Sequence, residues 1–106
     1  GVTVRKGATV RNSIIFSGTY IDENTNLDTM IIDKGVYVGK NSILGYGDDF
    51  SANHEKPDLL SRGISVVGKK AILPDGSIVG RNVRIFGGVK LHDGNKFVHS
   101  GETIKG

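Results

Sequence analysis

Aliphatic side chains return at every sixth position over residues 67–91 of this chain. They stand at Val67, Leu73, Val79, Ile85 and Leu91, with a small or β-branched residue four places after each of the first four. Glycine and polar residues fill most of the places between. Such a repeat is typical of a parallel β-helix, in which each hexapeptide supplies one strand and one corner. Three hexapeptides would close a triangular coil with the aliphatic residue inward and with glycine or asparagine at the corner.

The same register extends backward to the start of the chain. Its predicted inward positions are all aliphatic: Val4, Val10, Ile15, Ile21, Leu27, Ile32, Val38 and Leu44. Successive inward positions lie six or five residues apart, and two spacings of six and one of five make up one period. Segments one such period apart align with one another, as Val10–Gly18 does with Leu27–Gly35. We therefore expect an all-β domain over residues 1–106. Because hexapeptide coils normally wind against the right-handed crossover rule, we expect a single-stranded left-handed parallel β-helix of about five coils.

The repeat is interrupted over residues 45–63. This stretch is too long for a corner and carries four acidic residues and a proline, so we expect a loop excursion from the coil. Long loops inside compact domains often carry function or contact a partner. The alternative is a loop that packs on the solenoid wall through Phe50, Leu59 and Leu60. After the excursion and a second run of repeats, residues 97–104 are expected to form a final extended segment that caps the last coil.

Composition agrees with a narrow β-helical core. Hydrophobic residues make up 37% of the 106 residues, only seven are aromatic, and sixteen glycines suit the corners. The chain lacks cysteine, which excludes disulfides and thiolate metal sites and fits a reducing cytoplasm. No apolar run approaches the roughly 20 residues of a membrane span. We therefore expect a cytoplasmic, soluble protein with no membrane partner.

The net charge of +3 is mild, and we expect no nucleic-acid partner. The repeat is already in register at Val4, and the chain has no initial methionine. We interpret it as a piece of a longer protein.

The three histidines raise the possibility of a metal site or a general base. His54 falls in the excursion, whereas His92 and His99 follow the repeats, so the spacing argues against zinc and we expect no metal in this piece. His54 could serve a hexapeptide acyltransferase as its base only with help from another coil or subunit. The acidic residues of the excursion are better interpreted as solvated than as paired acids.

Basic side chains at successive corners would lie about 4.8 Å apart along the solenoid axis. The predicted register puts Lys6, Lys40 and Lys69 in one column, interrupted by Glu23, and puts Lys34 with Arg81 in another. Such columns can hold phosphate or sulfate through charge-assisted hydrogen bonds. They can equally serve only to keep a repeat surface soluble. No glycine-rich loop of the nucleotide-binding type is present.

The order of four features carries a resemblance to a known family. An Ile31-Ile32-Asp33-Lys34 element is followed by one more coil, the long excursion, and a Gly63-to-Ile78 stretch that contains Gly-Lys-Lys-Ala-Ile-Leu-Pro. In this order the chain resembles the C-terminal domain of ADP-glucose pyrophosphorylases, which are glucose-1-phosphate adenylyltransferases. The resemblance covers residues 10–89.

The resemblance implies a parent enzyme that joins ATP to glucose 1-phosphate for glycogen synthesis, using Mg2+ in an N-terminal catalytic domain absent here. It implies a homotetramer or a heterotetramer, of which we expect the homotetramer, and a phosphorylated sugar effector. It implies no cofactor or catalysis in this piece. Lys34 and Lys69 match the family's effector-binding lysines, with Lys40, Lys70 and Arg81 as further candidates. The predicted register nevertheless sets Lys34 and Lys69 on different corners.

Three alternatives remain open at this point. The chain could belong to a hexapeptide acyltransferase that uses His54, or to a mannose-1-phosphate guanylyltransferase, which also has a C-terminal hexapeptide domain. It could also be a purely structural β-helix, in which case the lysines would be dispensable.

Overall fold

The computed structural model describes all 106 residues, which form fourteen short strands and no helix. The strands stack into three parallel sheets, here called faces A, B and C. Face A consists of β1 (Thr3–Val4), β4 (Tyr20–Ile21), β7 (Tyr37–Val38) and β10 (Ile72–Leu73). Face B consists of β2 (Thr9–Arg11), β5 (Asn26–Asp28), β8 (Ile43–Leu44), β11 (Ile78–Val79) and β13 (Phe97–Val98). Face C consists of β3 (Ile14–Ile15), β6 (Met30–Ile32), β9 (Ser65–Val67), β12 (Arg84–Ile85) and β14 (Thr103–Ile104).

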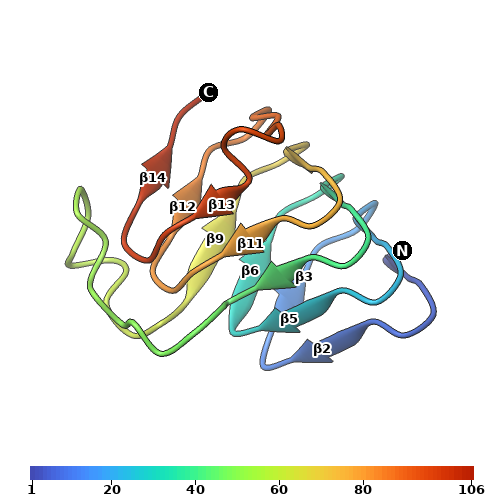
Figure 1. Cartoon of the computed structure of the whole chain (residues 1–106), viewed down its shortest axis with the longest axis horizontal. Coiled ribbons are helices and arrows are strands. Elements are labelled where there is room, and N and C mark those ends of the chain that lie inside the picture. Colours follow the sequence, from blue (N-terminus) through green and yellow to red (C-terminus); the bar gives the residue numbers. More distant parts are fainter.

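The chain is a left-handed parallel β-helix, as the hexapeptide pattern predicts. Figure 1 shows the strands of face B stacked side by side, with the loop after β8 leaving the coil. Faces B and C each hold five strands, and on face A a bridge between Ile72 and Lys90 extends the four strands. The stack therefore corresponds to five successive coils. Since the structure contains no helix, it holds none that could cross a membrane.

The predicted inward register is confirmed from the second coil onward. Its aliphatic residues from Ile21 to Leu91 are all 2% exposed or less. In the first coil, Val4 is 47% and Val10 is 37% exposed, because no coil below covers them. The open end of the solenoid is thus apolar and uncovered in this chain.

Twelve corners each turn through one residue with a positive φ angle. Corners between faces A and B use Gly7, Asn24, Asn41 and Gly76; those between B and C use Asn12, Thr29, Asn82 and Gly101; those between C and A use Gly18, Gly35, Lys70 and Gly88. Glycine and asparagine tolerate this left-handed region, as predicted for the corners. Only Thr29 and Lys70 depart from that rule.

The excursion connects β8 on face B to β9 on face C, so it replaces a single corner of the third coil. Its fold depends on Asn53, which is fully buried and whose side-chain amide donates to the carbonyl of Asn82 at 3.0 Å. Of the residues expected to pack on the wall, only Leu60 is buried, whereas Leu59 is 73% exposed. Phe50 is half exposed and lies under the guanidinium of Arg81.

The end of the chain differs from the prediction. Residues 97–104 do not form one extended segment but the two strands β13 and β14, joined by a corner at Gly101. They complete the fifth coil, and the inward position of this coil is occupied by Val98, which is 1% exposed.

Candidate functional site

Lys34 and Lys69 lie on the same corner, between faces C and A. Ile32 of β6 pairs with Val67 of β9, and the backbone N–H of Lys70 donates to the carbonyl of Lys34 at 2.9 Å. The predicted placement of the two lysines on different corners is therefore wrong. The predicted register assumed that Val67 stacks on Val38 of face A. The excursion instead replaces only one corner, so the chain resumes on face C and Val67 stacks on Ile32.

This corner carries three lysines and no ion pair. Lys34, Lys69 and Lys70 are all exposed, and none lies within 4.0 Å of an acidic side chain. Asp33 is the acidic residue on the same corner, and its carboxylate accepts the backbone N–H of Lys34 at 2.7 Å. The three ammonium groups are thus free to bind an anion through charge-assisted hydrogen bonds.

Glycine makes room for the Lys70 side chain at this corner. A Cβ atom at Gly35 would lie 3.4 Å from Cγ of Lys70, so the Lys70 stem passes over Gly35 in the coil below. Lys70 thus lies directly above Gly35, on the same corner as Lys34 and Lys69. We call Lys34, Lys69 and Lys70 the lysine corner.

Lys40 lies elsewhere, on a corner between faces A and B. There the register aligns Lys6, Glu23, Lys40 and Asp75 in one column of alternating charge, so the predicted column that continued from Lys40 to Lys69 is wrong. The carboxylate of Asp75 accepts the backbone N–H of Lys40 at 2.8 Å. An anion at Lys40 would meet acids above and below it.

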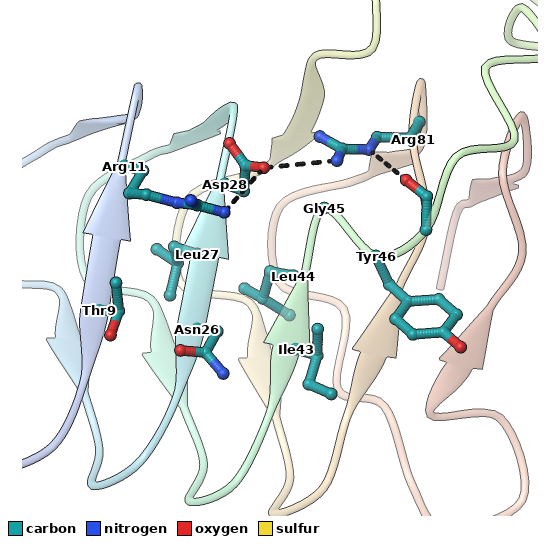
Figure 2. A pocket seen from close by; sticks show the side chains of 11 residues that line it. Thr9, Arg11, Asn26, Leu27, Asp28, Ile43, Leu44, Gly45, Tyr46 and Arg81 are labelled. Carbon is teal, nitrogen blue, oxygen red and sulfur yellow. Dashed lines mark hydrogen bonds and ion pairs between the residues drawn. The ribbon is translucent and has the colours of Figure 1, made fainter.

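Arg81 is also separate from Lys34, which contradicts the second predicted column. It lies on a corner between faces B and C and borders a hollow of about 420 Å³ on face B. In Figure 2, Arg11 and Arg81 extend from opposite sides toward Asp28, with N–O distances of 3.5 and 3.4 Å. Nε of Arg81 also donates to the carbonyl of Gly47 at 3.0 Å.

The charge of Arg81 is therefore shared with an acid. A hydrogen bond from Thr29, assisted by the charges of Arg81 and Arg11, holds the pKa of Asp28 below its usual value against the opposing effect of burial. The network links coils one, two and four and favours a structural role. Sequence reasoning missed Arg11 and Asp28, although their separation by one full period of the repeat was a signal that they would be neighbours.

The histidines lie on separate elements. The backbone N–H of His54 donates to the carbonyl of Gly101 at 2.9 Å, and the exposed side chain belongs to the excursion. The ring of His99 stacks on Phe97 at 4.4 Å, and its Nδ1 lies 3.4 Å from the carboxylate of Glu102. Nδ1 of His92 accepts the backbone N–H of Gly94.

The acids of the excursion are likewise dispersed. Hydrogen bonds from the side chain and backbone of Ser51 lower the pKa of Asp49. Glu55 forms an ion pair with Lys105 at 2.9 Å. The carboxylates of Asp49 and Glu55 therefore have separate partners, Ser51 and Lys105.

Comparison with known proteins agrees with this architecture. A family model described as "GlmU-like, C-terminal hexapeptide" matches residues 1–67. A glucose-1-phosphate adenylyltransferase of Thermomicrobium roseum is 45% identical over 95 residues, which are 89% of this chain and 22% of the relative. The enzyme of Acetivibrio thermocellus is 39% identical over 111 residues, which cover 97% of this chain and 26% of the relative. The enzyme of Pseudothermotoga lettingae is 33% identical over 113 residues, which cover 90% of this chain and 27% of the relative.

The chain spans about a quarter of the length of these relatives. No solved structure matches it. The resemblance to the C-terminal part of glucose-1-phosphate adenylyltransferases is confirmed. With the family model covering residues 1–67, this chain belongs to the GlmU-like C-terminal hexapeptide family.

Proposed function

We propose that this chain is the β-helical part of a glucose-1-phosphate adenylyltransferase and that it regulates and assembles that enzyme. The reaction proposed for the whole protein joins ATP to glucose 1-phosphate and yields ADP-glucose and pyrophosphate for glycogen synthesis. Catalysis and the Mg2+ ion are assigned to the part of the protein that this chain does not cover. The names of its relatives support the adenylyltransferase activity proposed for the whole protein.

One observation carries the regulatory role, namely the stacking of Lys34 on Lys69 without an acidic partner. Unpaired like charges on neighbouring coils repel each other, so they do not stabilise the fold. An anionic group bound between them would remove that repulsion. We infer that a phosphorylated sugar binds here and shifts the catalytic part between two states for which it has different affinities.

The assembly role rests on exposed apolar side chains of face C. Ile14 and Phe16, which flank the inward position Ile15, are 57% and 43% exposed. Apolar side chains on an outer face can contact another part of the protein. We propose that they contact the catalytic part and that the complete protein is a cytoplasmic homotetramer.

The test uses the full-length enzyme with Lys34→Glu and Lys69→Glu introduced separately. Each variant is expected to raise the half-saturating effector concentration at least about tenfold, which corresponds to about 1.4 kcal/mol, while activity without effector stays unchanged. Lys40→Glu is the matched control, since Lys40 is an exposed lysine on another corner. An unchanged effector response in both corner variants would leave only a structural role for this chain.

A further inference from the structure

Lys70 adopts a backbone conformation that lysine normally avoids. Its φ angle is +61°, and at the same corner the other coils place Gly18, Gly35 and Gly88, also with positive φ. A residue with a Cβ atom is destabilised in this left-handed region, where glycine is not. Lysine at this position therefore costs stability that glycine or asparagine would not.

The surroundings of Lys70 do not offset that cost. Thr29, the other exceptional corner residue, is half-buried and donates its hydroxyl to the carboxylate of Asp28 at 3.0 Å. Lys70 is exposed, forms no ion pair, and lies on a corner that carries two further lysines, Lys34 and Lys69. Both its backbone and its charge thus oppose folding.

Such strain persists at sites where it serves function. We propose that Lys70 is a specificity residue of the lysine corner, and that its third charge makes this corner prefer dianions, such as phosphate monoesters, over singly charged anions. This inference rests on the proposed function, because it concerns the same site. Each added ammonium group attracts a dianion twice as strongly as a monoanion at the same distance, so the third lysine increases selectivity as well as affinity.

The experiment compares the 106-residue chain with Lys70→Asn, since asparagine already occupies positive-φ corners at positions 24 and 41. Sulfate serves as the dianion and formate as the monoanion, and binding is followed by NMR chemical shifts of the corner amides. Sulfate binding is expected to weaken about threefold to fivefold, and formate binding less than twofold. Thermal unfolding is expected to shift upward by about 4–8 °C because the strain and repulsion are relieved.

Lys40→Asn makes the same change at another corner and is expected to alter neither sulfate binding nor the preference over formate. If Lys34→Asn and Lys69→Asn weaken sulfate binding while Lys70→Asn leaves it unchanged, this inference is overturned and the proposed function stands. If none of the three corner variants affects sulfate binding, both fail. A lower melting temperature for Lys70→Asn would also overturn the inference, since Lys70 would then serve the fold.

Discussion

Lys69 lies above Lys34 on one corner of the solenoid, although the third coil and the whole excursion separate them in the sequence. Where the excursion does not intervene, successive coils follow one another after about one period of the repeat, as in the pairing of Ile15 with Ile32. The excursion accounts for the extra length of chain between the two lysines. The lysine corner therefore depends on the excursion returning the chain to face C.

Reversing one charge at this corner should stabilise the isolated chain. Lys34→Glu places a carboxylate below Lys69, on the corner that also carries Lys70, which replaces repulsion by attraction. The melting temperature is expected to rise at low ionic strength, and the rise should shrink in roughly 0.5 M salt, because exposed charges are screened. Lys6→Glu is the control. Glu23 lies directly above Lys6 in its column, so this charge reversal replaces attraction by repulsion. An equal rise with both variants would contradict a specific effect at the lysine corner.

Loss of the Asn53 side chain should loosen the excursion. The side-chain oxygen of Asn53 accepts the backbone N–H groups of Glu55 and Lys56 at 3.0 and 2.9 Å, and its amide donates to Asn82. Asn53→Ala leaves the buried carbonyl of Asn82 and the two partly buried N–H groups without these partners, which we expect to lower the free energy of unfolding by about 2–4 kcal/mol. Chemical denaturation measures this change, and limited proteolysis should cleave within residues 45–63.

Asn26→Ala provides the matched control for that experiment. Asn26 is exposed on face B, so its truncation should change stability by less than about 0.5 kcal/mol. Equal losses for the two variants would mean that the buried hydrogen bonds of Asn53 do not hold the loop.

Two glycines with similar backbone angles should respond differently to alanine. Gly45 and Gly88 have φ angles of +83° and +74°, but a Cβ atom at Gly45 would lie 2.0 Å from the carbonyl oxygen of Asp28, whereas Gly88 has open space. Gly88→Ala should cost about 1 kcal/mol through backbone strain alone. Gly45→Ala should cost roughly 3 kcal/mol or more because the two coils must also move apart. Chemical unfolding of both variants tests this difference, and similar costs would show that close coil packing is unimportant at Gly45.

Tyr37 should make the chain sensitive to alkaline pH. Its hydroxyl donates to the carboxylate of Asp22 at 2.8 Å, and this bond, together with burial, raises the pKa of Tyr37 to about 12. An unfolded tyrosine titrates at roughly pH 10, so the stabilisation is fully present below that value and is lost as pH rises toward about 12. Ultraviolet titration should show one of the three tyrosines ionising late. Tyr37→Phe should abolish that late phase, whereas Tyr20→Phe should keep it.

Much of the fold could be predicted because its rules are local. Each hexapeptide carries its own inward residue, and the corners carry the glycine or asparagine that a left-handed residue requires. The exposure of Val4 and Val10 follows from their place at the end of the stack, which periodicity alone does not express.

The candidate site was less predictable. Lys34 and Lys69 were identified by resemblance to a family, but their neighbourhood was assigned wrongly from the register. The hydrogen bond between Asn53 and Asn82 could not be predicted from the repeat pattern, because it joins an irregular loop to a corner 29 residues away.

By itself, the sequence determined that this chain winds into triangular coils, which residues point inward, and which stretch leaves the coil. These properties repeat at short range and need no knowledge of distant contacts. Only the tertiary structure decided on which face the chain resumes after the excursion. The length of a loop does not specify where it returns; the hydrogen bonds between β6 and β9 do, and they set Lys69 above Lys34 rather than above Lys40.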